Sequence, residues 1–181
     1  VVCYEKSFDI GGVFANAWDG ATMISSNLLT AFGCFPLHTY HNRCVQQNVS
    51  AAAEVTMWTC NEYCAYLCSF VEHFDLMRHI RLGTNVEFVR RSENGTDWEV
   101  GTRHSTDGRT AVEAFEAVCV STGSHQVPHF PPWCQQLVDN ETLDKADPSR
   151  KKQRNRHVPQ IVHSSHFIGG SDYTNNKVDI A

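Results

Sequence analysis

The sequence lacks several features that mark whole classes of protein. Its 181 residues contain no stretch approaching the roughly 18 consecutive apolar residues of a membrane-spanning helix. No charged segment followed by a short apolar run marks a signal peptide, so a cytoplasmic chain without a membrane span is expected. Basic residues are not in excess, because the net charge is −5 at pH 7, and a nucleic-acid partner is therefore not expected.

A disulfide framework and a metal motif are also missing. The eight cysteines have no compact spacing and no secretion signal, so we expect reduced thiols. Cys60, Cys64 and Cys68 recur every four residues but match none of the common zinc or iron-sulfur spacings, which favours packing over metal binding. His163 and His166 have no evident third ligand beside them.

What is present indicates a globular chain, with 41% hydrophobic and 19% charged residues. A helix is expected over about residues 61–74, because Thr59 and Glu62 form a T-x-x-E capping box before an apolar stripe. The stripe consists of Tyr63, Tyr66, Leu67, Phe70 and Phe74. Its simplest function is to face a core.

Three strands are expected after this helix. They cover residues 80–91, 98–103 and 111–116, with turn signals at Asn94-Gly95 and Asp107-Gly108 between them. Short connections of this kind join antiparallel neighbours, so the segment predicts an antiparallel meander.

Two further strands are expected outside the meander. Residues 1–5 form an apolar run that ends in an acid, and residues 117–120 are wholly apolar, as in a strand buried on both faces. Residues 15–50 show no sustained periodicity, which predicts a loop-rich excursion with short helical pieces.

Glu5 occupies a position with a known chemical use. An acid at the end of the second strand of a dinucleotide-binding fold accepts hydrogen bonds from ribose hydroxyls, about 20 residues after a G-x-G-x-x-G loop. No such loop occurs in this sequence, and the chain opens at Val1 inside an apolar run. If Glu5 is that acid, the loop precedes residue 1, and we therefore expect a piece of a longer protein. The alternative for Glu5 is an ordinary solvated strand end.

Several stretches resemble, in the same order, the flavin-containing monooxygenase family. They are YEKSFDIGGVF, SSNLLTAFGCFP, YLCSFVEHFDLMRHIRLGTNVEFV, WEV, FEAVCVSTGSHQVPHFP and IVHSSHF. Residues 37–53 and 134–156 match the family poorly. The resemblance implies an α/β fold: a truncated Rossmann-like FAD-binding domain over residues 1–133, a polar surface insertion over 134–156, and a connection toward an NADPH-binding domain over 157–181.

The resemblance assigns cofactor-binding residues. Glu5 would hold the adenosine ribose of FAD, and the segment Gly11, Gly12, Val13 and Phe14 would lie along the cofactor. The family usually has Trp where this chain has Phe14, so stacking is kept but the indole donor is lost. The remaining cofactor-binding positions are Val86, Thr122 and Gly123.

The pair Ser26-Asn27 resembles the family's pair beside the flavin ring and the nicotinamide. Asn27 would be the catalytic residue, because a neutral amide orients the cofactor and the oxygen adduct without protonating it. We expect Asn27 to lie on the loop-rich excursion, outside the core.

His163 and Phe167 match the back half of the family's F-x-G-x-x-x-H-x-x-x-[YF] signature. The front half departs, because His157 and Pro159 stand where Phe and Gly belong. Related Baeyer-Villiger enzymes have Trp at the last signature position, so Phe167 favours oxygenation of nitrogen or sulfur over insertion into ketones.

The activity implied is that of an FAD-dependent, NADPH-using monooxygenase. NADPH would reduce FAD, dioxygen would form a flavin hydroperoxide, and a soft nitrogen or sulfur of a small molecule would take one oxygen. The alternatives are a non-catalytic remnant or truncated flavoprotein, and a Baeyer-Villiger type monooxygenase. A dithiol-disulfide reductase is disfavoured, because Cys34 and Cys44 are too far apart for a redox pair.

Overall fold

The computed structural model describes residues 1–47, 54–123, 127–132, 134, 163, 166, 167 and 169. The chain divides into two compact units, Val1–Cys119 and Val120–Ala181. The polar insertion expected at 134–156 lies outside the described residues except for Cys134. The proposed domain boundaries remain a prediction.

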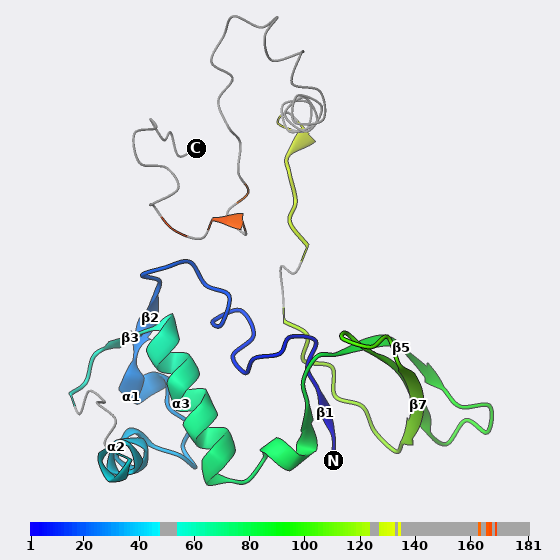
Figure 1. The fold of residues 1–181 in the computed structure, drawn as a ribbon, viewed down its shortest axis with the longest axis horizontal. Helices are drawn as coiled ribbons and strands as arrows, with labels where there is room; N and C mark the ends of the chain where they lie inside the picture. Colours follow the sequence, from blue (N-terminus) through cyan, green and yellow to red (C-terminus); the bar gives the residue numbers. More distant parts are fainter. Residues whose placement is uncertain are drawn as a thin grey trace, which may run out of the picture. The chain divides into compact units, whose positions relative to one another are not determined.

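The first unit contains a helical region with a small two-stranded sheet (Figure 1). Strand β2 (Thr22–Ser26) leads into α1 (Asn27–Thr30) and α2 (Leu37–Gln46), and β3 (Met57–Thr59) returns to pair antiparallel with β2. The short helical pieces expected here are confirmed. The pairing of β2 with β3 was not predicted, because it joins segments more than 30 residues apart.

Helix α3 (Cys60–His73) confirms the helix expected over 61–74. Its capping box is complete: Glu62 N–H donates to Thr59 Oγ1 over 3.2 Å, and Glu62 Oε2 accepts from Thr59 N–H over 2.7 Å. Two amide donors at the start of the helix are thereby satisfied, which stabilises the point where β3 turns into α3.

An aromatic core fills the space between these helices. Tyr66 and Phe35 are fully buried and Trp58 is 2% exposed. The Tyr66 hydroxyl donates to the Phe35 carbonyl over 2.6 Å and accepts from Phe32 N–H over 2.7 Å. The rest of the buried cluster is Leu37, Tyr40, Cys44 and Tyr63. The apolar stripe of α3 therefore faces a core, as predicted.

The chain start forms only a short strand. β1 (Cys3–Tyr4) pairs in parallel with β4 (Ile80–Arg81), which follows the 3₁₀ turn η1 (Met77–His79). The strand expected over residues 1–5 is thus reduced to two residues.

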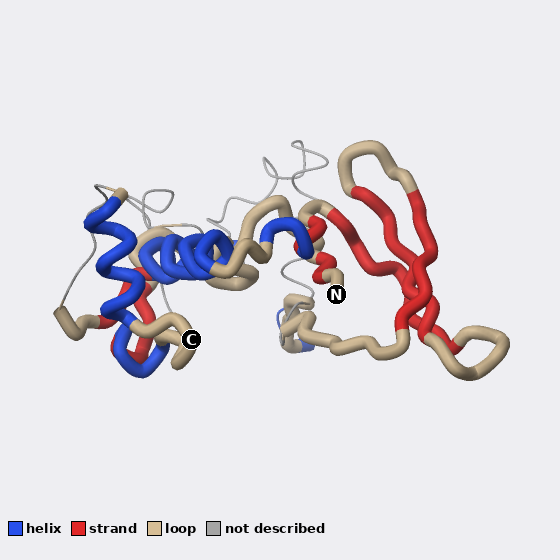
Figure 2. The backbone as a smooth tube through the Cα atoms, turned by 90° about the horizontal axis from the view of Figure 1, so that it is seen from below, coloured by secondary structure: helices blue, strands red, loops and turns tan. Residues whose placement is uncertain are grey.

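The predicted meander is confirmed. β5 (Thr84–Arg91), β6 (Trp98–His104) and β7 (Thr110–Phe115) form a three-stranded antiparallel sheet in the order β5-β6-β7, whose strands are drawn in red in Figure 2. Gly95 and Gly108 have φ angles of 72° and 70° in the two connections, a conformation that favours glycine.

The strand expected over residues 117–120 is wrong. These residues have no regular secondary structure, and Val120 is 72% exposed. A strand buried on both faces needs neighbours to pair with its backbone, and within the described residues no strand pairs with this segment. An apolar run is therefore not enough to predict a strand, because it does not show that a pairing strand exists.

Candidate functional site

Glu5 lies immediately after β1 on a fixed backbone. Its N–H donates to the Arg81 carbonyl over 3.0 Å, and its carbonyl accepts from Thr84 N–H over 2.8 Å. Its Oε1 accepts from Ser7, while no hydrogen bond from the described part of the chain reaches Oε2. A half-buried carboxylate with one available oxygen fits the expected role of accepting a hydrogen bond from a ribose hydroxyl.

The loop after Glu5 is closed against the start of β5. Ser7 carbonyl accepts from Gly83 N–H over 2.8 Å, and the Phe8 ring covers Gly83. A Cβ at Gly83 would lie 2.4 Å from Phe8 Cε1, and the φ of Gly83 is 59°. Glycine therefore fits this position without a steric clash or backbone strain, and other residues do not. This contact ties the Glu5 loop to the meander.

The two adjacent glycines have different surroundings. A Cβ at Gly11 would lie 2.7 Å from Cys64 Sγ, so this glycine allows the loop to pack closely on α3. A Cβ at Gly12 would meet nothing within 4 Å, and the φ of Gly12 is 55°. Gly12 therefore leaves an open backbone position that a ligand could approach.

Phe14 and Val13 also differ. The Phe14 ring contacts Tyr63 edge-on at a centroid distance of 4.9 Å and packs against the aromatic core. Val13 is 71% exposed. The expected packing role of Phe14 has a partner in this structure, whereas Val13 is free to contact a ligand.

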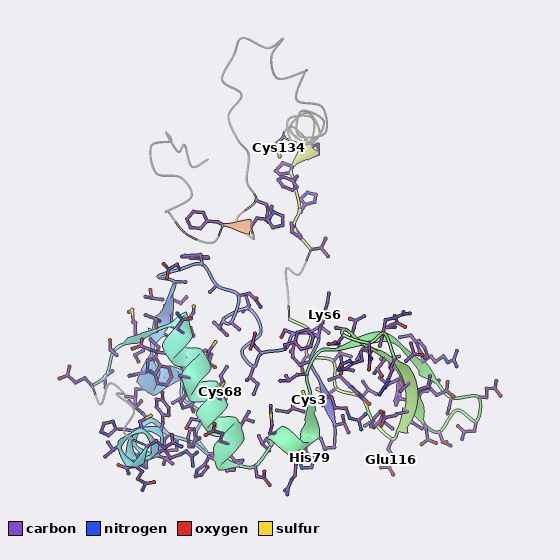
Figure 3. All side chains as sticks on the ribbon, in the orientation of Figure 1. Cys3, Lys6, Cys68, His79, Glu116 and Cys134 are labelled. Atoms are coloured by element: carbon purple, nitrogen blue, oxygen red, sulfur yellow. The ribbon has the colours of Figure 1, made fainter. Side chains whose placement is uncertain are left out.

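An open hollow of about 280 Å³ is lined by residues of this loop and of α3. Cys64 and Cys68 line it, and Cys68 is labelled on α3 in Figure 3. Burial raises the pKa of both thiols, which keeps them protonated at neutral pH and weakly nucleophilic. Within the described residues no group of three or more His, Cys, Asp or Glu side chains is arranged to hold a metal.

Asn27 differs from its sequence-based description. It is fully buried, its Nδ2 donates to the Glu54 carbonyl over 2.9 Å, and its Oδ1 accepts from Thr56 N–H over 3.2 Å. The expectation that Asn27 lies outside the core is wrong, because its amide joins α1 to the segment entering β3. Ser26, beside it, is the N-cap residue of α1 but makes no side-chain capping hydrogen bond; its backbone carbonyl accepts from Thr30 Oγ1 over 2.9 Å.

Val86 is the cofactor-binding candidate within the meander. It is 38% exposed on β5, pairs with Thr102 of β6, and precedes a register shift before Phe88. Its side chain is accessible, and its cofactor-binding role stays a prediction.

The remaining candidates lie in the second unit. Thr122 and Gly123 are exposed, and Gly123 has a φ of 80°. The His163 ring contacts Phe130 at a centroid distance of 5.2 Å, and Phe167 is 37% exposed. His157 and Pro159 lie outside the described residues. These roles also stay predictions.

One polar cluster was not anticipated. Tyr4 Oη donates to Glu113 Oε1 over 2.9 Å, and Arg81 Nη1 contacts the same oxygen, so β1, β4 and β7 are joined. Hydrogen bonds from Arg81 and Tyr4 hold the pKa of Glu113 below its usual value, while burial and then Glu113 raise the pKa of Tyr4 to about 12. No sequence pattern reports such a cluster, because its members are more than 30 residues apart.

No helix in the part of the chain that the structure describes is both long and apolar enough to cross a membrane.

Comparison with known proteins identifies relatives. The family model described as flavin-binding monooxygenase-like matches residues 1–137. The chain is 30% identical over 133 residues to 4-hydroxybenzoate brominase (decarboxylating) of Marinomonas mediterranea, covering 72% of this chain and 23% of that protein. It is 30% identical over 143 residues to human dimethylaniline monooxygenase [N-oxide-forming] 4, covering 71% and 23%.

Solved structures give the same result for the fold. S-allyl-L-cysteine S-oxygenase from Allium sativum superposes with a TM-score of 0.57 at 18% identity, covering 72% of this chain and 32% of that one. Cyclohexanone monooxygenase from Rhodococcus sp. Phi1, bound to NADP⁺, gives 0.55 at 30% identity, covering 72% and 22%. The expected fold class is confirmed.

The chain spans about a quarter of the length of the curated relatives it matches, at 23% for both. Because the family model covers residues 1–137, well over half of the chain, the chain belongs to the flavin-binding monooxygenase-like family.

Proposed function

We propose that the protein to which this chain belongs is an FAD-dependent, NADPH-using monooxygenase, and that residues 1–133 supply part of its FAD site. The observation that carries the proposal is the family match over residues 1–137. A related structure, cyclohexanone monooxygenase from Rhodococcus sp. Phi1, was solved with NADP⁺ bound. Bound FAD would supply the redox chemistry that activates dioxygen.

The geometry of the first unit fits such a cofactor at two positions. Glu5 Oε2 is available to accept from ribose hydroxyls. Gly12 leaves its backbone open to close approach. Phe14, held by Tyr63, would support the segment that lies along the cofactor.

Asn27 fits less directly. Both of its amide atoms are engaged inside the chain, so in this conformation neither is offered to a ligand. We propose that Asn27 acts by holding Ser26 and the start of α1 in place beside the flavin. Its effect on oxygen transfer would then follow from positioning.

We propose a soft nitrogen or sulfur of a small molecule as the substrate atom. The name of one similar protein, the N-oxide-forming dimethylaniline monooxygenase, supports oxygenation of nitrogen. Oxygenation of a cyclic ketone is the second candidate, since cyclohexanone monooxygenase is 30% identical over its match. Phe167 at the end of the signature favours the first candidate.

The test uses the full-length protein, expressed from the coding sequence that surrounds this stretch. It is supplied with FAD, NADPH and dioxygen, and offered a tertiary amine, a thioether and a cyclic ketone in separate reactions. We expect N-oxide or S-oxide to form with matched NADPH consumption. A lactone as the only product would support the second candidate, and absence of both FAD binding and NADPH oxidation would support a non-catalytic remnant.

A further inference from the structure

The Glu5 side chain is held by a neighbour two residues along the chain. Ser7 N–H and Ser7 Oγ each lie 2.8 Å from Glu5 Oε1. Ser7 Oγ also lies 3.0 Å from the Asp9 carbonyl, but its single proton favours the nearer, charged oxygen. One oxygen of the carboxylate is therefore already occupied within the chain.

The backbone around this pair is fixed on both sides. Glu5 is hydrogen-bonded to Arg81 and to Thr84, and the Ser7 carbonyl accepts from Gly83. Only the side-chain torsions of Glu5 remain free, and the two bonds from Ser7 restrict them. Lys6, labelled in Figure 3, stands between the two residues and is exposed.

We propose that Ser7 is a positioning residue that occupies Glu5 Oε1, so that Oε2 is the oxygen presented to the ribose hydroxyls of the cofactor. The inference rests on the proposed function and deepens it by assigning different roles to the two oxygens. Ordering a flexible glutamate costs conformational entropy, and Ser7 imposes much of that order before a ligand arrives.

The experiment measures dissociation constants in the full-length apoprotein, by fluorescence titration with FAD and with an FAD analogue whose adenosine ribose lacks both hydroxyls. Ser7→Ala removes one of the two bonds that hold Oε1, so FAD should bind about three- to tenfold more weakly. Binding of the analogue should change by less than about twofold, because its adenosine ribose has no hydroxyl to donate to Glu5 Oε2. The preference for FAD over the analogue should fall accordingly.

Ser7→Thr is the matched conservative variant, since it keeps the hydroxyl and should restore the preference to within about twofold of the parent. A purely structural role for Ser7 predicts another result: Ser7→Ala would weaken both ligands equally. That outcome, or unchanged binding of both ligands, would overturn the inference.

Glu5→Ala in the same assay separates this inference from the proposed function. If Glu5→Ala abolishes the preference for FAD and Ser7→Ala leaves it intact, the site stands and the role of Ser7 is rejected. If Glu5→Ala also leaves the preference unchanged, Glu5 does not contact the ribose and both assignments fail.

Discussion

The helical region (residues 21–74) and the meander (residues 80–115) are held together by different forces. The helical region has a buried aromatic core around Phe35 and Tyr66, both fully inaccessible to solvent. The meander has few buried side chains, Val100 among them, and depends on backbone ladders and cross-strand contacts. Burial of apolar area therefore stabilises the first region more than the second.

The candidate FAD segment connects to both regions. Glu5 is fixed by hydrogen bonds at β4 and β5, and Gly11 and Phe14 pack against α3. A single loop of about ten residues thus contacts the buried aromatic core at one end and the more exposed sheet at the other. Substitutions that weaken either region should show how much each contributes.

The largest effect is expected from the aromatic core. Phe35→Ala removes a fully buried ring and should cost about 3–5 kcal/mol, because the cavity it leaves cannot close completely. Hydrogen-exchange mass spectrometry of the full-length protein should show faster exchange throughout α3. Val45→Ala, at a residue 61% exposed on α2, is the control. If α3 were equally protected from exchange in both variants, the stabilising role of the Phe35 ring in the core would be contradicted.

The second effect concerns Asn27. Asn27→Ala leaves the Glu54 carbonyl and Thr56 N–H without their side-chain partners and should cost about 1–3 kcal/mol. Exchange should accelerate in the segment leading into β3. Asn16→Ala, at an exposed position, should change little. If Asn27→Ala leaves protection unaltered, its amide is free for another role.

In the meander a smaller effect is expected. A Cβ at Gly101 would lie 2.1 Å from Phe88 Cε1, so Gly101→Ala must displace that ring. The ring is 37% exposed and able to move, which limits the cost to about 1 kcal/mol. The double variant Gly101→Ala/Phe88→Ala should lose this added cost. If the effects of the two single substitutions on hydrogen exchange in β6 simply add in the double variant, the contact between Gly101 and Phe88 would be refuted.

The pH dependence of stability should be the smallest effect. Because the folded-state pKa of Glu113 is lowered, its contribution is present above the ordinary value of 4.5 and is lost as the pH falls below it. Thermal unfolding measured from pH 7 down to about pH 3 should therefore change less in Glu113→Gln than in the parent. Glu116→Gln, at the exposed position labelled in Figure 3, is the control, and its thermal unfolding should change with pH as in the parent.

Local patterns explain which parts of the fold could be predicted. The capping box at Thr59 and Glu62 and the glycine turns of the meander depend on neighbours within a few residues, so they are readable from the sequence. Residues 117–120 could not be assigned from composition, because a strand requires partners elsewhere in the chain.

The candidate site divides in the same way. The position of Glu5 at a strand end follows from a local pattern, and the structure agrees. The burial of Asn27 depends on Glu54 and Thr56, which are more than 25 residues away, so sequence alone could not show it. The Ser7 contact is local, but a serine two residues after a glutamate is too common to be a signal.

The most direct test of the account is the dissociation constant of FAD for the full-length protein with Glu5→Ala. Loss of a charged acceptor for ribose hydroxyls costs about 1.5–3 kcal/mol, so FAD should bind about 10- to 150-fold more weakly. Glu93→Ala, at an exposed turn of the meander, should bind FAD like the parent. An unchanged constant for Glu5→Ala, in a protein that still binds FAD, would contradict the assignment of this chain to the FAD site.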